Sequence, residues 1–280
     1  MLLLIAGKFI DNLESFVIIC IIDAMSKKII VANWKMNPAS LKEAKSLFDS
    51  AKKISSKLSK VETIICTPSI YLTELGHSMS KLKLGAQDVS VFGFEGTHTG
   101  EVSAKMLKNS GVKYVIIGHS ERRKIGETNE TINKKIGTAL SVGLKVIFCV
   151  GEEKRDKDGA FAEFIEIQIS EGLRGLGSDL VKNIIIAYEP VWAISGNAKS
   201  KADDPEAAFK VAVLIRKLLM SFVGNDMARK IPILYGGSVN SENAGKFLKD
   251  GQMDGLLVGS KSLNKEEFKK ILESANSVGR

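Results

Sequence analysis

Residues 184–222 read IIIAYEPVWAISGNAKSKADDPEAAFKVAVLIRKLLMSF. The first five, Ile184–Tyr188, form an apolar run that is typical of a strand buried on both faces of a parallel sheet. Asp204-Pro205-Glu206 then marks a helix start, because the aspartate can cap the helix, the proline suits its first position and the glutamate its first turn. Apolar residues recur at helical spacing from Ala208 to Phe222. The stretch therefore predicts one strand followed by one helix.

The same unit recurs along the chain from Lys28 onward. Seven further strand-like runs are Ile29–Ala32, Thr63–Cys66, Leu84–Ala86, Tyr114–Ile117, Val146–Val150, Ile233–Tyr235 and Leu256–Val258. Helices are expected between them, among others over Leu41–Leu58, over Glu101–Asn109 after a glycine-rich connection, and over Asn264–Ala275 at the end. Eight such units in about 250 residues favour an α/β fold of one domain, a closed (β/α)8 barrel. An open, doubly wound sheet of eight strands would show similar runs.

Composition limits the classes of protein and site. The chain has 280 residues, of which 44% are hydrophobic and 26% charged, as in an ordinary globular protein. The cysteines Cys20, Cys66 and Cys149 are widely spaced without a CxxC pair, and there are 3 histidines, so we expect neither a disulfide framework nor a metal site. No GxGxxG or Walker glycine pattern follows the first run, so no nucleotide cofactor is expected. We expect a reducing, cytoplasmic compartment.

The net charge of +8 does not indicate a nucleic-acid-binding protein. The 40 lysines and arginines occur in short groups with acids interleaved, and no basic block alternates with aromatic residues. A solvated lysine-rich surface is the simpler interpretation, and its positive field would suit the capture of a small anionic substrate. We therefore expect no nucleic-acid partner.

The N-terminal segment, residues 1–24, differs from the rest of the chain. Its apolar run Phe16–Ile22 is far shorter than the roughly 20 residues of a membrane span. Lys8, Asp11 and Glu14 interrupt its apolar residues, which disfavours a signal peptide. We interpret the segment as an extension from an upstream start site, or alternatively as an amphipathic arm, and expect the barrel domain over residues 25–280 without a membrane anchor.

Chemically useful side chains follow several of the strand-like runs. In a barrel, catalytic groups lie where strands end and the following loops begin. Glu189 directly follows an aliphatic run, where partial desolvation would make it a better base than an exposed glutamate. His119 precedes a helix start, whose dipole disfavours the imidazolium, so a neutral ring could donate a hydrogen bond to a carbonyl. Lys35 adds a cation. Taken singly, each of these could equally be structural.

The last two strand-like runs end in small residues. Gly236-Gly237-Ser238 follows the seventh run, and Gly259-Ser260 follows the eighth. Their backbone N–H groups could approach a phosphate closely, at the position where barrels commonly bind one. A base, a neutral hydrogen-bond donor, a cation and a phosphate site together indicate proton transfer next to the carbonyl of a phosphorylated substrate.

Four motifs identify a known family. Asn33-Trp34-Lys35-Met36-Asn37, Gly118-His119-Ser120-Glu121-Arg122-Arg123, Ala187-Tyr188-Glu189-Pro190-Val191-Trp192-Ala193-Ile194 and Tyr235-Gly236-Gly237-Ser238-Val239 occur in the order and spacing of the triosephosphate isomerases. The resemblance runs from about Lys28 to Lys270 and leaves out the first 24 residues. It implies a TIM barrel that interconverts dihydroxyacetone phosphate and D-glyceraldehyde 3-phosphate through an enediolate, without a cofactor, in glycolysis and gluconeogenesis.

The resemblance also implies roles for individual residues. Glu189 would move the proton and His119 would polarise the carbonyl, while Lys35 and Asn33 would stabilise charge and bind substrate oxygens. Glu121 would support the site without contacting the substrate. Phosphate would be held by residues at the family's phosphate-binding positions, Ser195, Ser238, Gly259 and Ser260.

A lid and a dimer are implied as well. Pro190–Ser200, which includes Trp192, would form a mobile lid, and Tyr235 and Ser238 match residues that hold it shut. In a homodimer, the loop around Gly96–Glu101 would enter the partner, with Thr99 near the partner's site residues and Gln87 in the same interface region. The chain departs from the family at the lid tip, at Ser260 and at Thr97-His98, which predicts altered lid kinetics, phosphate affinity and dimer strength.

Two other interpretations remain open. A Schiff-base aldolase or another sugar-phosphate isomerase could share the barrel, although an aldolase would need a lysine where the chain has Glu189. A barrel without activity that serves as a basic scaffold is the other, and steep salt-dependent binding to DNA without turnover would support it.

Overall fold

The computed structural model describes residues 27–76, 81–155, 160–194 and 204–279. Eight parallel strands close into a barrel in sequence order, with β1 paired to both β2 and β8. The strands are β1 (Lys28–Asn33), β2 (Val61–Thr67), β3 (Lys83–Ala86), β4 (Tyr114–Ile117), β5 (Lys145–Val150), β6 (Ile184–Tyr188), β7 (Ile233–Tyr235) and β8 (Gly255–Val258). The predicted closed (β/α)8 barrel is therefore confirmed, and the open sheet is excluded.

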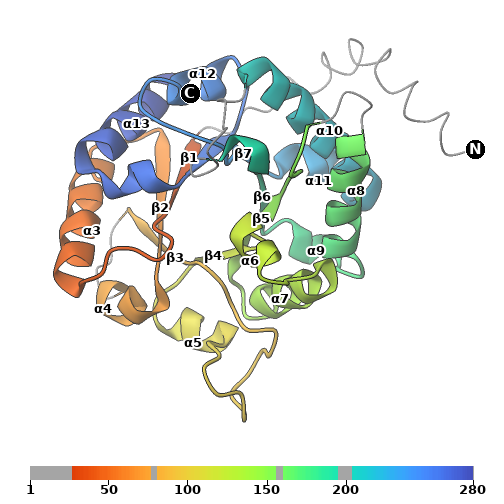
Figure 1. Cartoon of the computed structure of the whole chain (residues 1–280), viewed down its shortest axis with the longest axis horizontal. Helices are drawn as coiled ribbons and strands as arrows, with labels where there is room; N and C mark the ends of the chain where they lie inside the picture. Colours follow the sequence, from red (N-terminus) through yellow and green to blue (C-terminus); the bar gives the residue numbers. More distant parts are fainter. Residues whose placement is uncertain (1–26, 77–80, 156–159, 195–203, 280) are drawn as a thin grey trace, which may run out of the picture.

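Helices surround the barrel as an outer ring (Figure 1). They are α3 (Leu41–Ser55), α4 (Leu72–Gly76), α5 (Ala104–Asn109), α6 (Ser120–Lys124), α7 (Asn129–Ser141), α8 (Ala160–Leu173), α9 (Ser178–Val181), α10 (Pro205–Val223), α11 (Asn225–Lys230), α12 (Ala244–Lys249) and α13 (Lys265–Val278). Three short 3-10 helices are η1 (Ser69–Tyr71), η2 (Val191–Ala193) and η3 (Ser260–Leu263).

Alternation along each strand divides the buried residues into two cores. In β1, Ile29 and Val31 point into the barrel, whereas Ile30 and Ala32 pack against the helices. The barrel interior is filled by twelve buried side chains: Ile29, Val31, Ile64, Cys66, Tyr114, Ile116, Ile147, Cys149, Ile185, Ala187, Leu234 and Leu257. Because both faces are buried, the strands have the near-continuous apolar runs that the sequence shows.

Side-chain caps determine where several helices begin. Asp204 accepts a hydrogen bond from the N–H of Glu206 and precedes Pro205, as expected for α10. The helix expected from Glu101 instead begins at Ala104, because the Ser103 hydroxyl accepts from the N–H of Met106. Phe222, expected on the buried stripe of α10, is exposed.

The connection between β3 and α5 projects beyond the ring of helices (Figure 1). It carries the exposed Phe94 and a stacked pair, Phe92 and His98, whose ring centroids lie 3.5 Å apart. Among the described helices none is long and apolar enough to cross a membrane. The extension 1–24 lies outside the described residues.

Candidate active site

The carboxyl ends of β1, β4 and β6 bring three of the expected side chains to one end of the barrel. Asn33 ends β1, His119 follows β4 after one glycine, and Glu189 directly follows β6. All three are buried. Parallel strands in a closed barrel end at the same rim, so residues far apart in sequence meet there.

Glu189 is positioned by hydrogen bonds to both its backbone and its carboxylate. Its N–H donates to the carbonyl of Val150 at 2.8 Å, which fixes the start of the loop after β6. Carboxylate Oε2 accepts from the N–H of Ser120 at 3.1 Å, and Oε1 lies 3.2 Å from Nε2 of His119. A β-carbon at Gly151 would lie 1.9 Å from the Glu189 carbonyl oxygen, so only glycine fits there.

His119 has a defined tautomer in its neutral form. It caps α6, and its Nδ1 accepts a hydrogen bond from the N–H of Glu121 at 3.2 Å. A neutral imidazole carries one proton, so an accepting Nδ1 places that proton on Nε2. Nε2 faces Oε1 of Glu189. The ring can therefore donate a hydrogen bond at the point where the buried carboxylate can accept a proton.

Lys35 lies at the same rim in an unusual backbone conformation. Its φ of 52° is left-handed, and its N–H donates to Oδ1 of Asn33 at 3.0 Å. Nζ pairs with Oε1 of Glu121 at 2.8 Å. Burial acts to raise the pKa of Glu121, but the hydrogen bond and charge of Lys35 outweigh it, so that pKa lies below its usual value. Left-handed non-glycine residues cost of order 1–3 kcal/mol and cluster at functional sites.

Gln87 supports this loop from β3. Its side-chain amide donates to the carbonyl oxygens of Lys35 and Cys66, at 2.9 and 3.0 Å. Gln87 therefore contacts the active-site loop directly, besides lying at the start of the projecting connection. Thr99, at the far end of that connection, is exposed.

The expected phosphate-binding residues lie on neighbouring loops. A β-carbon at Gly259 would have only Cε of Lys35 within 4 Å, at 3.8 Å, and Ser260 beside it is exposed. The N–H of Ser238 donates to the carbonyl of Ala193 at 3.1 Å, which joins the loop after β7 to η2. Tyr235 is buried and stacks on Phe247, with ring centroids 3.8 Å apart. Ser195 and the rest of the expected lid through Ser200 lie outside the described residues.

A second buried carboxylate, missed as a site residue from the sequence, lies beside Glu189. Oε1 of Glu152 accepts from Nε1 of Trp192 at 2.9 Å and from the hydroxyl of Tyr188 at 3.0 Å, and pairs with Nε of Arg155 at 3.0 Å. Pro190, between the base and η2, is also buried. The position of Glu152 just after a strand was a signal for it, whereas Arg155 had none.

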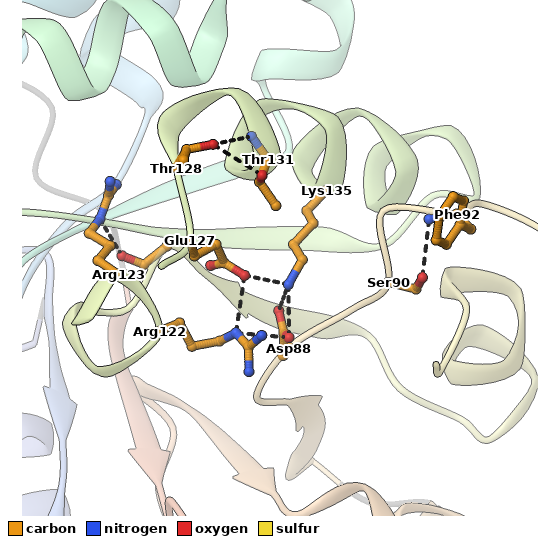
Figure 2. Close-up of polar contacts among 10 residues, drawn as sticks. Asp88, Ser90, Phe92, Arg122, Arg123, Glu127, Thr128, Thr131 and Lys135 are labelled. Atoms are coloured by element: carbon orange, nitrogen blue, oxygen red, sulfur yellow. Dashed lines mark hydrogen bonds and ion pairs between the residues drawn. The ribbon is translucent and has the colours of Figure 1, made fainter. Parts of the chain in front are cut away.

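A four-residue ion network supports helix α6 from the other side (Figure 2). Lys135 pairs with Asp88 at 2.7 Å and also with Glu127, and Nε of Arg122 lies 2.9 Å from Asp88 and 3.1 Å from Glu127. Burial raises the pKa of the Asp88 carboxyl, against the opposing effect of Lys135. The network connects the loop after β3 to α6 and α7, and thereby to His119.

Cys149 packs under the site as a buried, free thiol. Burial raises the pKa of this thiol, and the charge and hydrogen bond of the neighbouring Glu189 raise it further. It is therefore protonated at neutral pH and unsuited to act as a nucleophile. In the part of the chain that the structure describes, no group of three or more metal-binding side chains is arranged to hold an ion.

Comparisons with known proteins agree with this geometry. A family model described as "Triosephosphate isomerase" matches residues 28–275. A curated protein named triosephosphate isomerase from Dictyoglomus thermophilum is 44% identical over 254 residues, which cover 89% of this chain and 100% of that protein. Proteins of the same name from Natranaerobius thermophilus and Carboxydothermus hydrogenoformans are each 42% identical, over 90% of this chain and 97% and 100% of their own lengths.

These matches confirm the resemblance inferred from the four motifs, and they exclude the scaffold and aldolase interpretations. The chain belongs to the triosephosphate isomerase family, the isomerases of glycolysis that interconvert dihydroxyacetone phosphate and D-glyceraldehyde 3-phosphate.

Proposed function

We propose that Glu189 and His119 carry out the proton transfers of this isomerisation. The observation that carries the proposal is their geometry: two buried side chains 3.2 Å apart, with the neutral-ring proton on the nitrogen that faces the carboxylate. No lysine or arginine of the described residues forms an ion pair with Glu189, so its carboxylate can accept a proton without first giving up a cation. A neutral Nε2–H can stabilise charge that develops on a carbonyl oxygen.

The chemistry then balances without a further reagent. Glu189 takes the proton from C1 of dihydroxyacetone phosphate, and that C–H electron pair forms the C1=C2 double bond. The carbonyl π electrons move to O2, where Nε2–H of His119 stabilises the enediolate. The hydroxyl proton on O1 then passes to O2 by way of Nε2 of His119, and the first proton returns from Glu189 to C2 while the O1 electron pair forms the C1 carbonyl, which gives glyceraldehyde 3-phosphate. Lys35 supplies positive charge at the same rim, and Asn33 fixes the loop that presents it.

We assign phosphate binding to Ser238, Gly259 and Ser260, with Ser195 as a fourth position from the sequence. The loop after β8 has open backbone at Gly259 beside Lys35, where an anion would gain from N–H donors and from the cation. The substrate would lie between these loops and Glu189, with its reacting carbons toward the carboxylate.

A homodimer is proposed on the basis of exposed apolar residues on consecutive loops. Met36, Ile70, Phe94 and Ile125 follow β1, β2, β3 and β4, and their exposed fractions are 94%, 77%, 67% and 76%. Large apolar patches on one face mark interaction surfaces. Thr99 on the projecting connection would reach the partner's site. The free buried thiols Cys66 and Cys149 suit a cytoplasmic location.

The test combines turnover with isotope exchange. Glyceraldehyde 3-phosphate isomerisation is measured in a coupled assay for the native enzyme, for Glu189→Asp and for Glu153→Asp, an exposed control three residues after the end of β5. We expect Glu189→Asp to lose about 10²-fold or more in kcat, because the shortened carboxylate no longer reaches carbon. In D2O the native enzyme should place deuterium on C1 of dihydroxyacetone phosphate, as seen by NMR. Equal turnover and exchange in all three proteins would contradict the assignment.

The dimer has a separate test. Sedimentation of the native chain should give twice the monomer mass, whereas Ile125→Asp should shift it toward the monomer, because the charge would be buried in the interface. A native chain that sediments as a monomer at the concentration of the assay would contradict the dimer and leave the assignment of Glu189 intact.

A further inference from the structure

Arg155, in the loop after β5, is placed against the chain segment that holds Glu189. Its Nη2 donates to the hydroxyl of Tyr188 at 2.6 Å, and its Nε lies 3.0 Å from Oε1 of Glu152. The guanidinium carbon lies 4.2 Å from the ring centroid of Phe161 and 5.7 Å from that of Trp192. One side chain thus makes ionic, hydrogen-bonding and cation–π contacts with three different elements.

Glu152 links these contacts to the segment on both sides of the base. The hydroxyl of Tyr188, just before Glu189, donates to Oε1 of Glu152. Nε1 of Trp192, after Glu189, donates to the same oxygen. The N–H of Val191 donates to the carbonyl of Glu152 at 3.0 Å. Residues 188 and 192 are therefore fixed to the buried carboxylate of Glu152 and residue 191 to its backbone carbonyl, and Glu189 lies between residues 188 and 191.

That carboxylate requires a counter-charge. Only 2% of the Glu152 side chain is exposed, and within the described ranges Arg155 is the one cation paired with it. A buried carboxylate without a partner either becomes protonated or draws water into the site, and both weaken hydrogen bonds to the charged form. The planar guanidinium can face Glu152, Tyr188 and the ring of Trp192 at once, which an ammonium cannot do.

We propose that Arg155 is a positioning residue for the isomerisation: through Glu152, Tyr188 and Trp192 it holds the backbone of Glu189 at the site. The inference rests on the proposed role of Glu189 as the base. Among the described strands Arg155 hydrogen-bonds to β6 alone, through the Tyr188 hydroxyl, and its own side chain is 27% exposed. Its removal should therefore change catalysis far more than folding stability.

The experiment compares Arg155→Met with Arg155→Lys and with Arg174→Met. Arg174 is an exposed arginine whose ion pair with Glu171 is 3.9 Å long, so it controls for the loss of a surface charge. We expect Arg155→Met to lower kcat by about 10-fold to 30-fold with KM within about twofold, because the contacts of Arg155 lie on Glu152, β6, α8 and η2 and not on the loops after β7 and β8. Arg155→Lys should recover part of kcat, since it restores the counter-charge. Arg174→Met should match the native enzyme.

A second change separates positioning from packing. Adding Glu152→Gln to Arg155→Met leaves an amide oxygen that can still accept from Trp192 and Tyr188 but needs no counter-charge. We expect the double variant to have at least about threefold higher kcat than Arg155→Met alone. Emission from Trp192 gives a direct signature when the other tryptophan, the buried Trp34 between Asn33 and Lys35, is replaced by phenylalanine in every protein compared. The response of this emission to inorganic phosphate should change in Arg155→Met and be regained in the double variant.

The outcomes are distinct. A folded Arg155→Met protein with native kcat and a native response of Trp192 emission to phosphate would overturn the inference. The role of Glu189 as the base would still be supported if Glu189→Asp lost activity in the same assay. A kcat loss that the double variant does not reverse would also overturn it, because it would indicate lost packing only. If Arg155→Met does not fold, the ratio of kcat between Arg155→Lys and the native enzyme decides: no change contradicts positioning. Native activity in Glu189→Asp would instead remove the proposed function on which the inference rests.

Discussion

Two buried carboxylates follow neighbouring strands and are held in opposite ways. Glu152, two residues after β5, is 2% exposed, and its Oε1 takes two hydrogen bonds and an arginine. Glu189, one residue after β6, is 3% exposed, and it contacts a backbone N–H and a histidine nitrogen. No lysine or arginine of the described residues forms an ion pair with it. A carboxylate bound to a cation fixes structure, whereas one without a cation can accept a proton and move without breaking an ion pair.

The largest expected effect is the difference in kcat between Glu189→Gln and Glu152→Gln. We expect Glu189→Gln to lower kcat by roughly 10³-fold to 10⁴-fold, since an amide cannot accept a proton from carbon. Glu152→Gln keeps an acceptor oxygen for Trp192 and Tyr188, so its loss in kcat should be about fivefold at most. Coupled assays of both proteins, with circular dichroism as a check on folding, measure the ratio. Equal losses would mean that the two carboxylates do not differ in function.

The sequence predicts the fold well because the strands are buried on both faces. Runs such as Ile184–Tyr188 are apolar from end to end, and the observed strand has the same bounds. Helix ends are predicted less well, because local caps decide them: Ser103 starts α5 three residues later than the apolar pattern suggests. The stripe expected to reach Leu58 stops at Ser55, where α3 ends.

The active-site candidates are predictable where a strand end presents them directly. Asn33, His119 and Glu189 each lie within two residues of a strand end, and the closed barrel alone is enough to bring them together. Arg155 and Lys135 are not predictable in this way. Arg155 donates to Tyr188 in β6, 33 residues further along the chain, and Lys135 in α7 pairs with Asp88, 47 residues earlier, so these contacts depend on side-chain reach between separate elements.

A third buried carboxylate extends the comparison from rate to stability. Glu127 is paired with Lys135 and Arg122 and not with Asn33, His119 or Glu189 (Figure 2). Lys135→Met would remove one of the two positive charges that Glu127 and Asp88 share, so we expect a loss of about 3–5 kcal/mol in the free energy of unfolding. The neighbouring Lys134→Met removes an exposed pair with Glu130 and should cost less than about 1 kcal/mol. Urea titration measures both, and similar values for the two lysines would contradict a structural role for the network.

His119→Gln tests the partner of the free carboxylate. The variant loses the ring that caps α6 through Nδ1 and donates through Nε2, so we expect kcat to fall by about 10²-fold to 10³-fold. The effect should fall on turnover more than on KM, because stabilisation of the enediolate is made only during reaction. His98→Gln, a change in the exposed projecting connection away from the rim, is the matched histidine control, and sedimentation of both variants checks that they have the same assembly state. A fall in kcat of less than threefold for His119→Gln would contradict the role of His119 in stabilising the enediolate.

The smallest expected effect concerns the space in which Glu189 moves. A β-carbon at Gly236 would lie 2.9 Å from Cγ of Glu189, 3.2 Å from the carbonyl oxygen of Tyr188 and 3.5 Å from Cδ2 of Leu257, so Glu152 is not among its three nearest neighbours. Gly236→Ala should therefore displace the base and leave the held carboxylate in place, with a loss of about tenfold in kcat. Gly177→Ala is the control, since no atom lies within 4 Å of the added carbon. Melting temperatures of the two variants within a few degrees would show that the loss is local. If Gly236→Ala kept full kcat, Glu189 would not need the space beside the glycine. The difference between Glu189 and Glu152 would then depend only on the cation that Glu152 has and Glu189 lacks.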